Sequence, residues 1–126
     1  MPDLNQAIPV GSFGQEAVRK MLGGPLVPVA VNGAIDPSTA QRYIFTKATA
    51  LALTLGAPRV GLDDGTQLQF ISSNNAQHVI TATGLFQDGA GHVNTATWPA
   101  NNGGELDIIA YQGKWIVQNL QSVVMA

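Results

Sequence analysis

Apolar and polar residues alternate in short runs from about residue 41 to the end of the chain. In residues 51–55, three leucines alternate with Ala and Thr. A period of two is typical of a strand with one buried face. Ala and Leu also favour helix, but the strict alternation and the nearby Pro58 favour a strand. We therefore predict a strand over residues 51–55.

Similar runs follow at spacings of about ten residues, separated by Asp-Gly, Asn-Asn and Gly-Gly turn signals. The pair Gln112-Gly113 joins two of them and is typical of a two-residue hairpin loop. No helical pattern between the runs could connect parallel strands, so the pattern predicts antiparallel pairing. The expected strands are residues 42–46, 51–55, 67–71, 78–81, 85–87, 92–98, 106–111 and 114–117.

A faint internal repeat relates residues 65–71 to residues 103–109, since each run follows a turn and alternates in the same way. Two similar units facing each other would close a β-sandwich. Common strand and turn chemistry would produce the same likeness without a repeat. We predict that residues 41–126 form an all-β domain, an antiparallel β-sandwich or jelly-roll-like barrel.

The first 40 residues have a different composition, with five of the seven prolines. Proline removes amide donors, so long regular elements are disfavoured and we predict an irregular N-terminal arm over residues 1–40. Apolar residues at helical spacing, followed by Gly23-Gly24-Pro25, predict one short helix over residues 15–22. Residues 26–31 are predicted to be extended, with Pro28 suited to an edge strand.

The charge of the chain disfavours several classes of partner. Charged residues make up 11% of the chain, and the formal net charge is −2, whereas about 25% charged residues is usual. The few Lys and Arg residues are scattered, so we expect no nucleic-acid partner. No apolar run approaches the ~20 residues of a membrane-spanning helix, and the first residues lack the pattern of a signal peptide. We expect no membrane partner and synthesis in the cytosol.

Candidate catalytic groups are few. His78 and His92 are the only side chains suited to proton transfer near neutral pH, and both are interpreted as structural residues of strands. Glu105 and Asp107 lie on one face of a predicted strand, where we expect a solvated face rather than a catalytic pair. No nucleophile elbow or phosphate loop occurs. We predict no enzymatic activity. A small β-barrel enzyme is kept only as the least favoured alternative.

Cofactor and metal sites are not predicted either. The chain has no cysteine, which removes thiolate ligands and disulfides. Asp63-Asp64 and Asp88 each stand before a glycine but lack the ligand spacing of a calcium loop, so they are interpreted as turn formers. Trp115 alternates in register with Val117 and is predicted to lie in the core.

The β domain resembles small structural proteins of tailed bacteriophages, namely head decoration, cement or head-fibre proteins. The resemblance lies in residues 51–55, 63–72, 78–81, 85–89, 95–97 and 104–117. It implies a domain, commonly trimeric, that binds the outside of a capsid and stabilises it. The implied partners are the major capsid protein and further copies of this chain, and the implied location is the exterior of the virion.

An irregular arm would suit such binding, because it can lie across a neighbouring protein and order on contact. Its expected anchoring residues are Phe13, Val18, Met21, Leu22 and Val27. The alternative function is a fibre or spike module that recognises a cell-surface glycan. For that function we expect an exposed Trp98 next to the loop at Asn101-Asn102.

Overall fold

The computed structural model describes residues 25–89, 91–100 and 103–126. These residues form ten strands and no helix, so the predicted all-β fold is confirmed. None of them belongs to a helix long and apolar enough to cross a bilayer. The strands are β2 (Leu26–Val29), β3 (Gly33–Ile35), β4 (Arg42–Phe45), β5 (Ala52–Leu55), β6 (Gln67–Ser72), β7 (Val79–Asp88), β8 (Gly91–Thr97), β9 (Gly104–Tyr111), β10 (Lys114–Gln121) and β11 (Val124–Met125).

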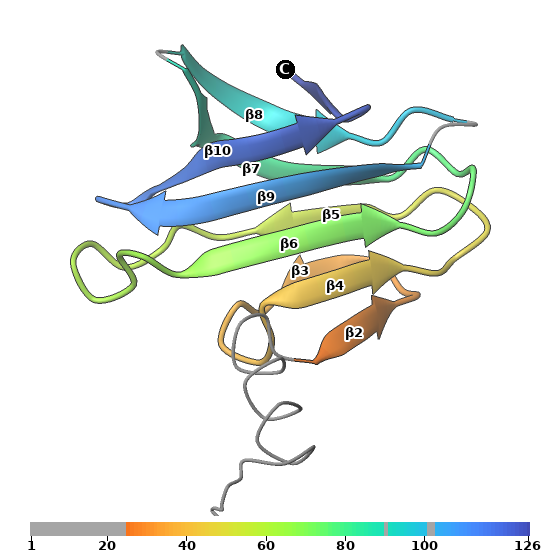
Figure 1. The fold of residues 1–126 in the computed structure, drawn as a ribbon, viewed down its shortest axis with the longest axis horizontal. Coiled ribbons are helices and arrows are strands. Elements are labelled where there is room, and N and C mark those ends of the chain that lie inside the picture. The colour runs from red at the N-terminus through yellow and green to blue at the C-terminus, as the bar shows by residue number, and fades with distance from the viewer. Residues whose placement is uncertain (1–24, 90, 101–102) are drawn as a thin grey trace, which may run out of the picture.

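The strands belong to one mixed sheet that curls on itself into a half-barrel with two facing layers (Figure 1). The front layer contains β10, β9, β6, β4 and β2 in that order. The back layer contains β8, β7, β5 and β3, with β11 beside β8. The layers join where β10 pairs in parallel with β7, with Trp115 opposite Phe86.

From β2 to β7 the chain alternates between the two layers, one strand in front and the next behind. The front strands β2, β4 and β6 pair in parallel, so that Arg42 lies opposite both Leu26 and Gln69. The back strands β3, β5 and β7 also pair in parallel, with Leu53 opposite both Gly33 and Ile80. We call each pair of a front strand and the following back strand a coil, and the three coils stack side by side.

This topology corrects the prediction of a wholly antiparallel sheet. Five of the nine strand pairings are parallel, and the antiparallel ones involve β8, β9, β10 and β11. Parallel neighbours require a crossover connection, which is usually a helix. Here the strand of the opposite layer makes the crossover, so no helix is needed.

The sheet also begins before residue 41. Within the predicted arm, residues 26–35 contribute β2 and β3 to the two layers. Strand β2 lies at the edge of the front layer, which confirms the expectation for Pro28. The predicted helix over residues 15–22 lies outside the described residues.

The two repeat-like segments lie side by side in the front layer instead of facing each other across the core. Strands β6 and β9 pair antiparallel, with Gln69 opposite Asp107 and Phe70 opposite Leu106. The hairpin from β9 to β10 follows directly, with positive φ values of 50° at Gln112 and 79° at Gly113. Two consecutive residues with positive φ form the predicted tight hairpin turn.

The core lies between the layers. Leu51, Leu53 and Leu55 are buried, as their alternation predicted. Phe45 occupies the centre, with its ring stacked 6.2 Å from Phe70 between centroids. The largest fully buried side chains come from both layers: Trp98, Trp115, Phe45, Phe70, Phe86, Leu51, Leu68, Ile80, Leu106, Ile108 and His78.

Candidate functional site

The stack of coils ends at β2 in front and at β3 behind. Within the described ranges, β2 pairs only with β4, and β3 pairs only with β5. We call this side of the molecule, from Leu26 to Ile35, the open end. An edge strand presents unpaired backbone groups and is therefore a natural place for contact with another chain.

Proline limits strand addition at the front edge. The carbonyl of Val29 accepts a hydrogen bond of 3.0 Å from the N–H of Thr46, so the backbone groups of Val29 point towards β4. Neighbouring residues in a strand point their backbone groups to opposite edges, so Pro28 points outwards. Because Pro28 has no N–H, an added strand would lack one hydrogen bond there. Side-chain contacts are therefore better suited than backbone pairing to bind a partner at this edge.

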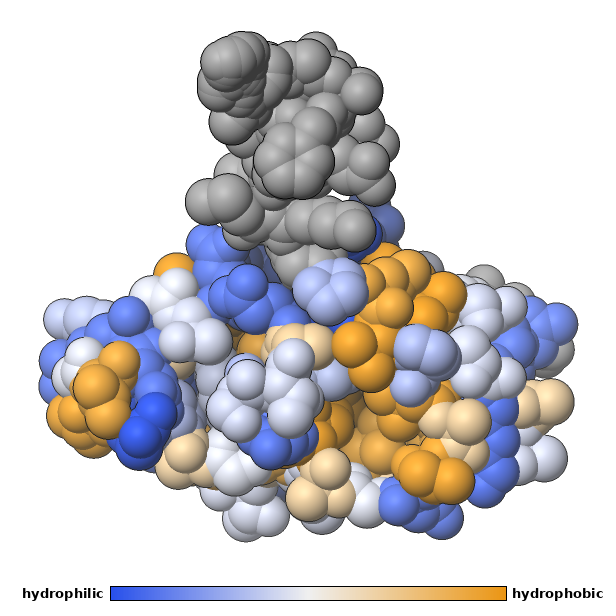
Figure 2. All heavy atoms as spheres, turned by 90° about the horizontal axis from the view of Figure 1, so that it is seen from below, coloured by the Kyte–Doolittle hydropathy of each residue, from blue (hydrophilic) through white to orange (hydrophobic). Residues whose placement is uncertain are grey.

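The open end exposes apolar side chains. Leu26 is 41% exposed and Val31 is 74% exposed, while Val27 and Val29 are half-buried and pack against the core. Figure 2 views the molecule from below, the side on which β2 lies in Figure 1, and shows apolar surface reaching solvent among polar side chains. The open end therefore combines exposed aliphatic groups with supporting residues that are already ordered.

One predicted anchoring residue falls within this region. Val27 lies in β2 and packs against the protein's own core. The other four, Phe13, Val18, Met21 and Leu22, lie outside the described residues, in the segment that directly precedes β2. The open end and this segment are therefore adjacent along the chain.

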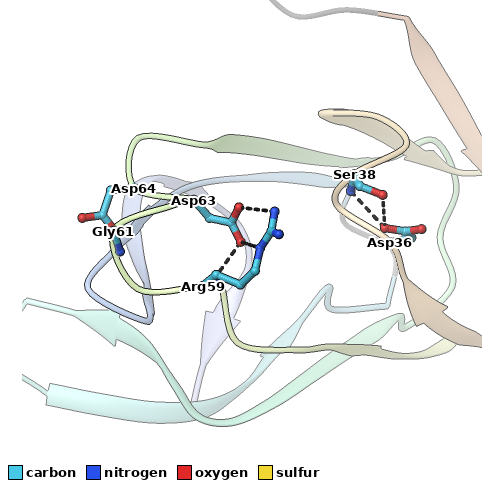
Figure 3. Close-up of polar contacts among 6 residues, drawn as sticks. All are labelled: Asp36, Ser38, Arg59, Gly61, Asp63 and Asp64. Carbon is cyan, nitrogen blue, oxygen red and sulfur yellow. Dashed lines mark hydrogen bonds and ion pairs between the residues drawn. The ribbon is translucent and has the colours of Figure 1, made fainter.

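The turn after β3 is held by a local carboxylate. Oδ1 of Asp36 accepts hydrogen bonds from the N–H of Ser38 at 3.0 Å and from its hydroxyl at 2.6 Å (Figure 3). These bonds lower the pKa of Asp36 below its ordinary value, because they stabilise the ionised form. The Tyr43 hydroxyl lies 2.9 Å from the Asp36 carbonyl oxygen. The backbone leaving the open end is thus fixed by side chains.

A second exposed apolar group lies on the loop between β5 and β6, where Val60 is 67% exposed and Leu62 is 70% exposed. Arg59 closes this loop, with its Nε 3.1 Å from Oδ2 of Asp63 and its Nη2 2.9 Å from Oδ1 (Figure 3). The hydrogen bonds from Arg59 also lower the pKa of Asp63. The loop therefore presents its two aliphatic side chains in a defined conformation.

Asp64 ties the same loop to the β9–β10 hairpin. Its Oδ1 accepts from the N–H of Gly61 at 3.2 Å and from the N–H of Gln112 at 3.0 Å. Asp63 and Asp64 both organise the turn, as predicted. Among the residues that the structure describes, no group of three or more His, Asp or Glu side chains could hold a metal ion.

His78 has a structural role, as predicted, but it is fully buried and lies directly before the start of β7. Its Nδ1 accepts a hydrogen bond of 3.1 Å from the N–H of Leu51, so the ring proton lies on Nε2, which is 2.9 Å from Oδ1 of Asn74. Burial, followed by the positive charge of Lys47, lowers the pKa of His78 below 6.5. His92 lies at an exposed position of β8.

The expectation that Trp98 is exposed is wrong. The side chain is completely buried, its Nε1 donates to the carbonyl of Gly104 at 3.1 Å, and its ring meets Phe45 edge-to-face at 4.9 Å. The N–H of Trp98 donates to the carbonyl of His78 at 2.8 Å, so the chain stays beside the start of β7 at this residue and becomes exposed only after Pro99. Trp98 shares its strand face with buried Ala96, and that alternation was the signal for burial. Asn101-Asn102 lies outside the described residues.

Trp115 lies in the core as predicted, and its Nε1 donates to the carbonyl of Gly56 at 2.9 Å. Both tryptophan N–H groups therefore have backbone partners, as buried indoles usually do. The described surface has no tryptophan on which a sugar ring could stack.

The outward face of the front layer carries a polar network that sequence reasoning missed. Arg42 Nε donates to Oε1 of Gln69 at 3.0 Å, and Nε2 of Gln69 donates to Oε2 of Glu105 at 2.7 Å. Glu105 and Asp107 are half-buried rather than freely solvated. These residues are far apart in the sequence, and only the register of β4, β6 and β9 brings them together.

Comparisons of the chain with protein-family models, with curated proteins and with solved structures found no significant match.

Proposed function

We propose that this protein is a non-enzymatic structural protein of a virion that binds the outer surface of a phage capsid and stabilises it. The major capsid protein is the proposed partner, and trimers are the proposed state of the protein. The proposal rests on the resemblance to phage head decoration proteins, on the low charge and on the geometry of the open end.

The open end is the observation that carries the proposal. It exposes Leu26 and Val31, and the segment with the predicted anchoring residues joins the sheet at the same place. Burial of an aliphatic side chain stabilises a complex by about 1.5–3 kcal/mol. The open end of each copy can therefore supply a modest interface with the capsid. Many copies on one shell then stabilise it together.

The neutral surface suits this kind of contact. Only 11% of the residues are charged, and burying neutral polar groups costs less than burying charges. A decoration protein must cover seams between capsid subunits, where both partners lose water over a broad area. In the alternative glycan-binding function, Trp98 would stack on a sugar, and its burial removes that support.

Capsid binding by single-residue variants tests whether the open end makes the contact. The purified chain would be added to undecorated capsids of the phage that encodes it, and bound protein would be measured after sedimentation. Val31→Asp is expected to reduce binding at least tenfold, because it places a charge in the proposed contact. Val60→Asp is the matched control, since Val60 is 67% exposed and Val31 is 74% exposed, and it should bind normally.

Two results would contradict this assignment. Loss of binding in Val60→Asp with normal binding in Val31→Asp would move the contact to the β5–β6 loop. Normal binding in both variants and in a chain lacking residues 1–24 would exclude the open end and the arm together. Thermal unfolding of each variant shows whether a change in binding reflects a loss of stability.

Truncation separates an anchor on the capsid from a segment that supports its own domain. If the apolar residues before β2 contact the capsid, removing residues 1–24 lowers binding steeply and leaves the melting temperature of the isolated protein nearly unchanged. A fall in melting temperature by several degrees would show instead that the segment packs on its own sheet.

A further inference from the structure

Glu105 and Asp107 form a carboxyl pair on the outward face of β9. They are two residues apart in the strand and therefore share one face. The register places Asp107 between Gln69 of β6 and Asn119 of β10. Both acidic side chains are half-buried, so water does not fully separate their charges.

One oxygen of this pair has no visible donor. Oδ1 of Asp107 is inaccessible to solvent and has no hydrogen-bond partner, the single such side-chain atom among the described residues. The other oxygen, Oδ2, lies 3.4 Å from Nδ2 of Asn119. A buried acceptor without a donor loses about 1–3 kcal/mol, so an unsatisfied oxygen calls for an explanation.

The neighbouring carboxyl group can supply the missing donor. Arg42 donates to the amide oxygen of Gln69, which fixes the amide so that its nitrogen donates to Oε2 of Glu105. Gln69 lies opposite Asp107, so the bond from its amide to Oε2 of Glu105 brings the Glu105 carboxyl group towards Asp107 on the same outward face. Two ionised carboxylates are both acceptors and cannot bond to each other, whereas one proton turns the contact into a strong hydrogen bond.

We propose that Glu105 and Asp107 share one proton, with the Glu105 carboxyl group donating to Oδ1 of Asp107, and that this makes the front layer an acid-stabilised surface. The proton converts two facing acceptors into a donor and an acceptor. It also reduces the charge of the pair to −1.

The surrounding charges favour this state. Arg42 of β4 is the one positive side chain that faces the pair from the described strands, and the facing residues of β6 and β10, Gln69, Asn119 and Gln121, are neutral. With the shared proton, one negative charge faces one positive charge; without it, two negative charges do. Burial, and then the contact with Asp107, raises the pKa of Glu105 above its ordinary value of 4.5.

Because folding raises the pKa of Glu105, the pair stabilises the folded protein more at low pH than at high pH. A carboxyl group whose pKa is raised by folding contributes stability that is complete below its unfolded pKa near 4.5 and is lost as the pH rises through the folded pKa. Most carboxylates in proteins stabilise the fold in the opposite direction. The pair therefore makes the pairing of β9 with its neighbours stronger in mild acid.

Carbon-13 NMR of the side-chain carboxyl groups tests the proposal on the unmodified protein. Glu105 is expected to titrate above pH 4.5, and Asp107→Asn is expected to bring its titration back towards that value. Chemical denaturation from about pH 4 to pH 8 supplies a second readout. Each pH unit by which the pKa is raised changes the unfolding equilibrium constant about tenfold, and Glu105→Gln should remove this contribution.

Asp88→Asn is the matched control, because it neutralises an exposed carboxylate at the end of β7 and should leave the titration of Glu105 unchanged. Titration of Glu105 at or below 4.5 in the unmodified protein would overturn the proposal. So would stabilisation by millimolar Ca²⁺ or Mg²⁺ at neutral pH that Glu105→Gln abolishes, since a cation would then replace the proton. The NMR titration of Glu105 is made on the unmodified protein, so it remains a valid test even if a variant folds poorly.

Discussion

The backbone N–H of Leu51 donates a hydrogen bond of 3.1 Å to Nδ1 of His78 in the protein interior. This bond joins the start of β5 to the start of β7, two parallel neighbours in the back layer. It also determines the tautomer, because a nitrogen that accepts a hydrogen bond cannot carry the ring proton. His78 is therefore a connecting residue between two coils.

Acidification should weaken this connection. Because burial lowers the pKa of His78 below 6.5, the unfolded chain takes up a proton more readily than the folded protein. The stability from neutral His78 is complete above pH 6.5 and is lost as the pH falls towards the lowered pKa. Urea denaturation from about pH 8 to pH 5 should show this loss, and His78→Gln should remove it.

The Glu105–Asp107 pair acts in the opposite direction, so the measurement on His78 is best made in a Glu105→Gln background. A pH dependence that His78→Gln leaves unchanged in that background would contradict the assignment. It would show that another group titrates between the two states.

Replacing Trp98 should lower the free energy of unfolding strongly, because the side chain fills the core between the layers. Trp98→Ala removes a completely buried ring and leaves the Gly104 carbonyl without its donor. Such truncations cost about 3–5 kcal/mol. Tyr111→Ala is the control, because Tyr111 is 57% exposed and its loss should change the free energy of unfolding by less than about 0.5 kcal/mol. Equal effects of the two variants would contradict the burial of Trp98.

Gly104 should not tolerate a side chain. A Cβ atom there would lie 2.6 Å from the carbonyl oxygen of Gln121 and 3.3 Å from Cδ1 of Trp98. Gly104→Ala must therefore displace β10 or the indole, at a cost of at least about 1–3 kcal/mol. Gly56→Ala is the control, because a Cβ atom at Gly56 would have no neighbour within 4 Å. Thermal unfolding should separate the two variants by several degrees.

Removing the Asp64 carboxylate should detach the β5–β6 loop from the hairpin. Asp64→Ala leaves the N–H groups of Gly61 and Gln112 without their acceptor, which costs about 1–2 kcal/mol. Asp64→Asn keeps an acceptor oxygen and should lose less. Amide hydrogen exchange at Gln112 should accelerate in the alanine variant. Unchanged exchange at Gln112 in that variant would show that the carboxylate does not protect this amide.

The sequence pattern located most of the strands and much of the core, but the predicted strands over residues 78–81 and 85–87 form the single strand β7, and β3 and β11 were not predicted. The leucines of residues 51–55 fall on the buried face, Trp115 is buried, and the turn at Gln112-Gly113 has the expected positive φ values. Each of these features is local, because alternation and turn chemistry act over a few residues.

The sequence pattern could not predict which strands pair with one another. Alternation shows which face of a strand is buried but not which strand lies beside it, so parallel coils and antiparallel hairpins look alike. The same reason hid the contact from Arg42 through Gln69 to Glu105, since it depends on register. For Trp98, the neighbouring proline and loop indicate exposure, whereas its alternation with Ala96 indicates burial, and the alternation is the signal that holds.

The path of the chain between the two layers also affects the order in which the strands can pair during folding. The hairpins β7–β8 and β9–β10 join neighbours in sequence and can form early, because short loops close quickly. Strands β2 to β6 find their partners only after a full coil of chain, and β6 needs β9 on its other side. During synthesis the N-terminal coils leave the ribosome before the hairpins against which they pack. We therefore expect the sheet to be completed from the hairpins backwards, once β9 and β10 have emerged.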